Sequence, residues 1–339
     1  MSDNTFGTNN PDVVTQGAAE IGRLVQVRER TGTKVVSGPS VSAERRAAIL
    51  TQGYGRRKTT NALVFGFSIL CAVIAIVPLF AITAFILFQG VTSFSLAFFA
   101  HAQADVNLTN ALAPPLGIGN TIVGTLLLVL VASVIGLPIG LFSGVYLAEY
   151  GRNSRFANTV RFIADVVAGL PSIVAGMVGY ALIVVTFTPH FSALAGGFAL
   201  ALLMFPVVTR ATEEVLRLVP DSLREAGMAL GIPRWRIVAS IVLPTASSGI
   251  ITAMLLGIAR VTGETAPLLF TSFGNAHWEF NPLKPVSALT YTIYDYSLNQ
   301  AGAGYHQYAY AGALVLVAVV VLLNVGARAL FRQRVRGRT

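Results

Sequence analysis

The sequence predicts an all-α polytopic membrane protein that crosses the bilayer six times. Of its 339 residues, 54% are hydrophobic and only 12% are charged, whereas a typical soluble domain carries about 25% charged residues. So few charges cannot cover a water-facing surface, which excludes an ordinary soluble enzyme and a disordered chain. Each of six apolar stretches is long enough to cross about 30 Å of hydrocarbon. These stretches are 62–88, 118–147, 163–187, 191–208, 237–270 and 308–331.

The distribution of Lys and Arg predicts that both termini are cytoplasmic. Segment 91–117 contains neither residue type and segment 272–307 contains only Lys284, whereas segments 149–162 and 210–236 carry three and five arginines. Positively charged loops stay on the cytoplasmic side, and an even number of spans agrees with this topology. We therefore interpret the net charge of +9 as a topology signal and expect no nucleic-acid partner. The predicted location is the inner (cytoplasmic) membrane, with lipid around the spans.

Composition divides the chain into three predicted parts. Residues 1–58 are polar and basic and predict a disordered or partly ordered cytoplasmic tail, without the pattern of a signal peptide. Residues 59–331 form the membrane domain, and residues 332–339 form a short basic cytoplasmic tail. The single cysteine, Cys71, lies in an apolar run without metal-ligand spacing. We expect no catalytic residue, no metal site and no cofactor bound by this chain.

Two sets of residues spaced four apart predict local contacts. Gly136, Gly140 and Gly144 recur at every fourth position, a spacing that lets helix backbones approach closely. Arg161 and Asp165 are also four residues apart, which predicts an ion pair on one helix face near the membrane surface.

The segment between the fourth and fifth stretches predicts a short capped helix. Ser222 followed by Glu225 fits a capping box, and Gly231 fits a left-handed C-terminal cap. The helix between them has its apolar residues on one face. They are Leu223, Ala226 and Leu230. Such a helix either fits a groove on a partner or caps the bundle of spans, and the residues by themselves leave both alternatives open.

Two charges lie inside the fifth apolar stretch. Arg260 and Glu264 are four residues apart, and a charge at the centre of a span costs at least about 2.5–3.5 kcal/mol. The pair either locks the bundle or lines a substrate pathway, which is the default interpretation for ionisable residues in spans. Pro267 cannot donate a hydrogen bond to the carbonyl of Gly263, which leaves a polar backbone group there. Two hydroxyls are nearby, those of Thr262 and Thr265.

The chemistry of the charged pair suits an oxyanion. A guanidinium donates two parallel hydrogen bonds to a tetrahedral anion. A carboxylate beside it would accept the proton that hydrogen phosphate carries and sulfate lacks. We hypothesise that Arg260 attracts the anion and that Glu264 helps to select a protonated one.

The short loop helix also carries a recognisable motif. The motif consists of Glu225-Ala226-Gly227, Gly231, Ile241, Leu243 and Pro244. It resembles the signature loop of ABC importer permeases, with Gly227 in place of the second alanine. The resemblance implies a type I ABC importer permease fold and a coupling loop at about residues 213–236. In that family, the loop docks on an ATPase subunit dimer that binds ATP and Mg.

A second motif narrows the resemblance. Arg260-Val-Thr-Gly-Glu-Thr-Ala-Pro-Leu-Leu269 resembles the A-type permeases of phosphate-specific ABC importers. The resemblance implies transport roles for Arg260 and Glu264, and it places Arg210 and Glu213 at matching positions near the inner membrane edge. It also implies two further partners, a paralogous C-type permease chain and an extracytoplasmic phosphate-binding protein.

Two alternative functions stay open on the residues alone. One is an ABC permease for another oxyanion, such as sulfate or molybdate, with the same coupling loop. The other is an ion-coupled secondary transporter in which Arg260 and Glu264 relay protons. The capped loop helix argues against the second alternative, because a self-sufficient carrier needs no element for binding an ATPase.

Overall fold

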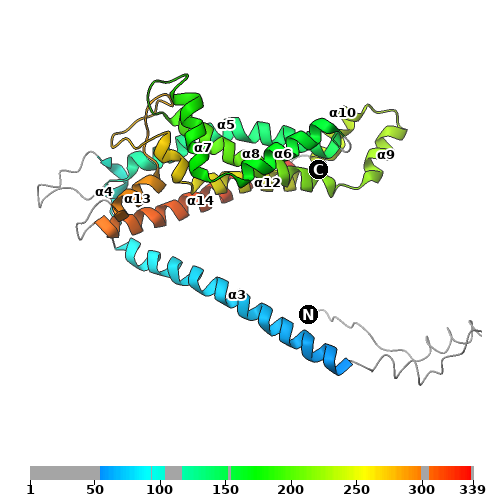
Figure 1. The fold of residues 1–339 in the computed structure, drawn as a ribbon, viewed down its shortest axis with the longest axis horizontal. Coiled ribbons are helices and arrows are strands. Elements are labelled where there is room, and N and C mark those ends of the chain that lie inside the picture. The colour runs from blue at the N-terminus through cyan, green and yellow to red at the C-terminus, as the bar shows by residue number, and fades with distance from the viewer. Residues whose placement is uncertain (1–53, 93, 104–116, 152–153, 299–304, 337–339) are drawn as a thin grey trace, which may run out of the picture. The chain divides into compact units, whose positions relative to one another are not determined.

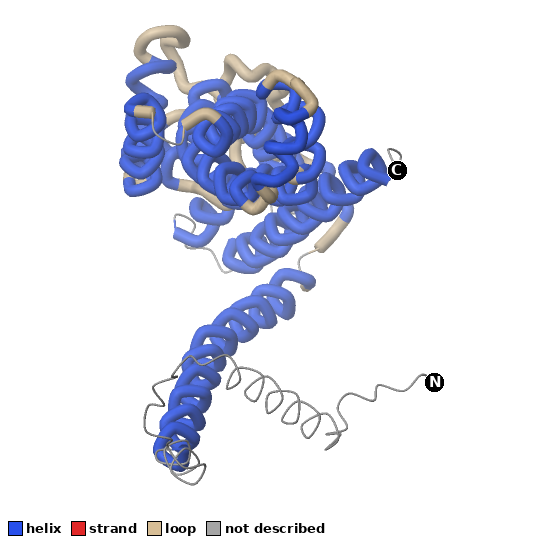
Figure 2. Tube along the Cα trace, turned by 90° about the vertical axis from the view of Figure 1, so that its right-hand side faces the viewer, coloured by secondary structure: helices blue, strands red, loops and turns tan. Residues whose placement is uncertain are grey.

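The computed structural model describes residues 54–92, 94–103, 117–151, 154–298 and 305–336 (Figure 1). Nearly all of the predicted tail 1–58 and the end of the predicted tail 332–339 lie outside these residues. The chain divides into two compact units, Met1–Ile76 and Val77–Thr339. In the first unit, the described residues form the beginning of one helix, and the other elements lie in the second. All regular structure within the described ranges is helical (Figure 2), which confirms the predicted all-α class.

Six spans account for most of the helices. Four single helices are long and apolar enough to cross a membrane: α3 (Tyr54–Val91), α5 (Gly119–Glu149), α8 (Ala193–Arg217) and α14 (Tyr305–Arg336). In one bent pair, α6 (Arg155–Gly169) precedes α7 (Ser172–Gly179) and the π-helical turn η2 (Tyr180–Val184). In the other, α10 (Arg234–Ile237), the π-helical turn η3 (Val238–Val242) and α11 (Leu243–Thr245) precede α12 (Ser247–Thr262). When each bent pair counts as one span, the described residues contain up to six candidate spans, which agrees with the predicted six.

Four short elements lie between the spans. They are α4 (Leu96–Ala100), α9 (Asp221–Ala229), the 3-10 helix η4 (Ala266–Phe270) and α13 (Leu289–Leu298). Helix α9 is the predicted loop helix, and η4 follows directly after the predicted charged pair.

The third and fifth spans are bent rather than continuous. The first pair turns by 108° and the second by 75°. Leu170 is extended at ψ 135°, because a residue that precedes a proline, here Pro171, is disfavoured in helical conformation. The second bend lies at Ala246, two residues after Pro244, a residue that removes a helical donor. The fifth span also ends at Thr262, well before the predicted residue 270.

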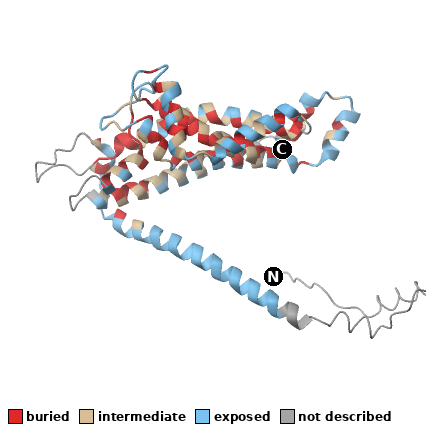
Figure 3. Cartoon of the chain, in the orientation of Figure 1, coloured by how far each residue is buried: buried red, intermediate tan, exposed pale blue. Residues whose placement is uncertain are grey.

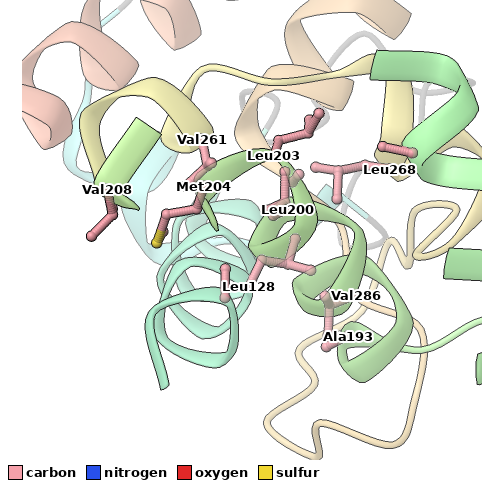
Figure 4. Packing of buried hydrophobic residues seen from close by; sticks show 12 residues of the cluster. Leu128, Ala193, Leu200, Leu203, Met204, Val208, Val261, Leu268 and Val286 are labelled. Carbon is pink, nitrogen blue, oxygen red and sulfur yellow. The ribbon is translucent and has the colours of Figure 1, made fainter. Parts of the chain in front are cut away.

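The core of the second unit lies where α5 and α8 pack together. Leu128 of α5 and Leu200 and Met204 of α8 are each at most 1% exposed. Val261 of α12 and Leu268 of η4 belong to the same cluster (Figure 4). The cluster therefore connects the α5–α8 contact with the two elements that flank Glu264.

Glycines allow α5 and α8 to approach closely, as their spacing predicted. A Cβ on Gly140 would lie 2.8 Å from the Cβ of Val208, and one on Gly144 would lie 2.7 Å from the carbonyl oxygen of Thr209. No side chain fits at such distances. Since lipid is as apolar as a leucine side chain, close packing of this kind is what stabilises contacts between helices in a bilayer.

Candidate functional site

The predicted charged pair lies where α12 ends. Arg260 is in the last turn of α12, Gly263 caps the helix, and the backbone N–H of Glu264 donates to the carbonyl of Val261 at 3.2 Å. The Nη2 atom of Arg260 is 4.0 Å from Oε1 of Glu264, and the two side chains are 50% and 21% exposed. A separation of 4.0 Å is an ion pair but too long for a hydrogen bond. The guanidinium of Arg260 is thus half-exposed, and Glu264 does not occupy the N–H donors of this guanidinium.

Packed neighbours hold the backbone around Glu264. The hydroxyl of Thr290 in α13 donates to the carbonyl of Glu264 at 3.0 Å. Pro267 of η4 is buried, and a Cβ on Gly176 of α7 would lie 2.7 Å from its Cα and O atoms. Leu268 belongs to the core cluster, and η4 contacts α7 and α8, while the carbonyl of Glu264 itself is bonded to α13. The site therefore combines a half-exposed arginine with a firmly packed backbone.

The two predicted threonines differ in their environment. The hydroxyl of Thr262 donates to the carbonyl of Ile258 at 2.7 Å, and the residue is 3% exposed. The hydroxyl of Thr262 is therefore bonded within α12 itself. Thr265 is half-buried and precedes η4. A contact of either residue with substrate stays a prediction.

Arg210 and Glu213 belong to a second charged group, on α8. Glu213 is 4% exposed and lies between three arginines. Its Oε1 atom accepts from Nε and Nη2 of Arg161 at 3.0 and 2.9 Å and from Nη2 of Arg217 at 2.5 Å. Arg210 pairs with Asp165 of α6, and its Nη1 atom is 3.6 Å from Oε2 of Glu213.

The predicted ion pair between Arg161 and Asp165 is therefore wrong. Each residue instead bonds to α8: Arg161 to Glu213, and Asp165 to Arg210. A buried carboxylate such as that of Glu213 needs compensating charge, and for this reason Arg161 of α6 pairs with α8 instead of with its own helix.

Within the described ranges, no group of three His, Cys, Asp or Glu side chains is placed to hold a metal ion.

The loop helix α9 begins two residues earlier than the capping box predicted. Its N-cap is Pro220 at ψ 136°, without a side-chain cap bond, and Asp221 is its first residue. Ser222 is consequently inside the helix, and the predicted capping box with Glu225 is wrong. The physical reason is that proline favours this extended conformation before a helix and supplies no side-chain acceptor.

The predicted cap at the other end of α9 is confirmed. Gly231 has φ +72°, in the left-handed region that suits glycine. Its N–H donates to Met228 O at 2.9 Å, and the N–H of Ile232 donates to Gly227 O at 3.2 Å. These are the two bonds of a Schellman motif, which satisfies the last carbonyls of the helix.

The apolar face of α9 is exposed (Figure 3). Leu223 is 38% and Leu230 is 79% exposed, and Ala226 is also exposed. Gly227 is the buried residue of the helix, and a Cβ there would lie 2.9 Å from Cδ1 of Ile237. The leucines are therefore not used to cap the bundle, and this favours the alternative in which the helix meets a partner.

Sequence reasoning missed a buried ion pair between α9 and α5. Glu149 is the last residue of α5 and 2% exposed, and its Oε1 atom lies 2.6 Å from Nη2 of Arg224. The side-chain hydrogen bond with Glu149 raises the pKa of Arg224 above its usual value. One signal was available: Glu149 is the single charged residue of a 31-residue apolar helix, and such a residue requires a partner.

The fold and the exposed loop helix define a membrane component of a transport system. Residues 136–337 match the family described as "Binding-protein-dependent transport system inner membrane component", which is more than half of the chain. The chain belongs to this family, and its place in a membrane agrees with the predicted location.

Curated relatives are more specific. The chain is 44% identical over 246 residues to the "Phosphate transport system permease protein PstA" of Yersinia pestis, covering 73% of this chain and 81% of that protein. It is 38% identical over 280 residues to the protein of the same name from Xylella fastidiosa (strain Temecula1), covering 82% and 94%. The predicted resemblance to A-type phosphate permeases is confirmed.

Among solved structures, similarity was found at a lower sequence identity. A chain of the MetNI methionine ABC transporter in an inward-facing conformation has 21% identity and a TM-score of 0.48, covering 66% of this chain and 94% of that one. Similarity of this order assigns no conformation to the present chain.

Proposed function

We propose that this chain is the permease subunit of an ATP-driven importer of inorganic phosphate. It forms half of the translocation pathway and works by alternating access, with both termini in the cytoplasm. The observation that carries the proposal is the similarity to PstA proteins over most of the chain. The half-exposed Arg260 beside Glu264 supplies the matching chemistry. A permease for sulfate or molybdate is not favoured by these relatives.

Arg260 is the residue proposed to attract phosphate. Its side chain is half-exposed, and Glu264 is 4.0 Å away, so the donors of the guanidinium are available to an incoming oxyanion. A charge-assisted hydrogen bond contributes about 1.5–3 kcal/mol when desolvated, and two parallel bonds also orient the anion. Glu264 is the less exposed member and is proposed to accept a hydrogen bond from the P–O–H group of hydrogen phosphate.

The proposed assembly contains three kinds of partner. An ATPase subunit dimer, which binds ATP and Mg, docks on the exposed Leu223, Ala226 and Leu230. The sequence itself has no Gly-x4-Gly-Lys-Ser/Thr loop, the motif that cradles nucleotide phosphates in such ATPases. A paralogous C-type permease supplies the other half of the pathway, and an extracytoplasmic phosphate-binding protein delivers the substrate. This chain is thus a transport component, and hydrolysis takes place in the ATPase.

The proposal is tested by ATP-dependent uptake of labelled phosphate into vesicles that contain the full assembly. Arg260→Ala is expected to lower uptake about tenfold or more, while a pull-down shows that the ATPase still assembles. Arg155→Ala is the matched control, because Arg155 is exposed on α6 and should leave uptake unchanged. Normal uptake by Arg260→Ala would overturn the role of Arg260. A parent assembly that moves sulfate or molybdate instead of phosphate would overturn the substrate.

The role of Glu264 has its own test. Glu264→Gln keeps the shape of the side chain but accepts no proton near neutral pH. The preference for phosphate over sulfate, measured as the ratio of the two uptake rates, is expected to fall. An unchanged ratio would refute the proposed selection of a protonated anion.

A further inference from the structure

Helix α9 has little apolar anchorage to the spans. Of its nine residues, Gly227 is the buried one, and its contact with Ile237 is small. Arg224 is the half-buried residue of the helix, and its side chain is 17% exposed. The polar interactions of Arg224 therefore contribute strongly to holding α9 in position.

The guanidinium of Arg224 uses every donor it has. Its Nε–H is shared between Oε1 and Oε2 of Glu149, at 3.2 and 3.1 Å. The Nη2 atom donates to Glu149 Oε1 at 2.6 Å and to Leu216 O at 3.0 Å. The Nη1 atom donates to Val219 O at 2.7 Å and to Asp221 Oδ1 at 3.2 Å. Arginine has five N–H donors in a rigid fork, so this side chain is fixed in a single geometry.

These acceptors belong to three different elements. Glu149 ends α5, Leu216 lies in the last turn of α8 with Val219 just beyond that helix, and Asp221 is the first residue of α9. The carbonyls at the end of a helix have no partner within that helix, so Arg224 supplies one to α8. The carboxylate of Glu149 is 2% exposed, and separating it from Arg224 would leave a buried charge uncompensated. The connection therefore resists being pulled apart.

A second arginine holds the same end of α5. Arg234, at the start of α10, donates to the backbone carbonyl of Glu149 and lies 5.3 Å from the ring centroid of Tyr150. Cavities of about 320 and 220 Å³ are both lined by Glu149, Arg224 and Arg234. Apolar side chains do not fill this space, so the mechanical link between α9 and α5 is the ion pair.

We propose that Arg224 and Glu149 form a strut that transmits a displacement of α9 to the ends of α5 and α8. The inference rests on the proposed function, in which an ATPase moves α9. Since glycines hold α5 and α8 in close contact, the two helices move together. Their shared core cluster includes Val261 and Leu268, on either side of Glu264. The strut therefore connects the docking helix with the proposed phosphate site, and both residues act by positioning.

The test uses Glu149→Gln in the full assembly, because glutamine keeps the size of the side chain and removes its charge. The measured quantity is the number of ATP molecules hydrolysed per phosphate imported. A side chain that serves assembly alone would lower hydrolysis and uptake in proportion and leave this ratio unchanged. For a strut, the ratio is expected to rise at least about fivefold, the lower end of typical coupling between sites.

Asp221→Asn is the matched control. Asp221 accepts from the same arginine at 3.2 Å, but its side chain is 53% exposed and belongs to α9 itself. The pair that Asp221 forms with Arg224 lies within α9 and is exposed, so the loss of this pair is expected to change the ratio less than about twofold. Arg224→Gln, which removes the strut from the other side, should match Glu149→Gln or exceed it.

Two results would overturn the inference. One is an unchanged ratio in Glu149→Gln and Arg224→Gln with the ATPase still bound, whether or not hydrolysis and uptake fall in proportion. The other is an equal rise of the ratio in Asp221→Asn. A parent assembly that imports no phosphate refutes the proposed function, and the strut is then judged by amide hydrogen exchange. In that case, Glu149→Gln should speed exchange across 221–229 about fivefold or more, and unchanged exchange would refute the strut.

Discussion

Gly176→Ala is expected to disturb the proposed site through a backbone contact. A Cβ at this position would lie 2.7 Å from Cα and O of Pro267, whereas ordinary contact begins at 3.4 Å, so the two backbones must separate by about 0.7 Å (3.4 − 2.7). Overpacking of this kind costs about 1–3 kcal/mol, and the better helix propensity of alanine offsets about 0.5–1 kcal/mol of it. The expected net loss of stability is about 1–2 kcal/mol. Because Pro267 is three residues after Glu264, the carboxylate also shifts, and we expect phosphate uptake to fall on the order of tenfold.

The assay pairs thermal denaturation of the purified assembly with phosphate uptake in vesicles. Gly169→Ala is the control on the same bent pair, because a Cβ there meets nothing within 4 Å. It should preserve both the melting temperature and uptake. If Gly176→Ala also retained both, the close contact between α7 and η4 would be refuted, together with its role in positioning Glu264.

Three further predictions concern other parts of the chain. Gly231→Ala forces alanine to φ +72° and should lower the stability of the fold by about 1–2 kcal/mol. Co-purification of the ATPase with this variant should decrease. Gly231→Asn should restore co-purification, because asparagine tolerates the left-handed conformation. Glu213→Gln leaves Arg161 and Arg217 around a neutral amide and should lower stability by about 3 kcal/mol in thermal melts; an unchanged melting temperature would contradict the buried ion pair. The pKa of Glu279 lies below 4.5, mainly because the backbone N–H of Asn281 donates to its carboxylate, with a further contribution from Lys284. A carboxylate whose pKa is lower in the folded than in the unfolded state stabilises the fold at pH values above its unfolded pKa. This contribution to stability is lost as the pH falls through the folded pKa. The difference in melting temperature between the parent and Glu279→Gln should therefore be present at neutral pH and shrink as the pH falls through the lowered pKa of Glu279. A difference that stayed constant into strong acid would exclude this cause.

Local signals in the sequence were sufficient where a single residue dictates the backbone. Gly231 could be predicted as a left-handed cap, because glycine adopts positive φ without steric cost and is the usual residue just after the end of a helix. The spacing of Gly136, Gly140 and Gly144 likewise predicted a close approach to a neighbouring helix. The structure identifies this neighbour as α8.

Predictions that depended on a choice among partners were less successful. Spacing allowed Arg161 to pair with Asp165, but Glu213 on another helix is buried and attracts it more strongly. Ser222 had the correct spacing for a capping box, but Pro220 had already started the helix. The partner of Glu149 was also hidden, since Arg224 follows it by 75 residues. Such pairings are decided by which side chains the fold buries together.

The π-helical turn η3 determines the direction in which Arg260 is presented. In this turn, the N–H of Leu243 donates to the carbonyl of Val238, five residues back. A π turn contains one residue more than an α turn, and each residue rotates the following helix by about 100°. The number of residues in Val238–Val242 therefore sets the direction, about the axis of the preceding helical segment, in which the chain bends at Ala246. Deletion of one residue there would keep the bend but rotate the direction of α12, and with it Arg260, by about 100°.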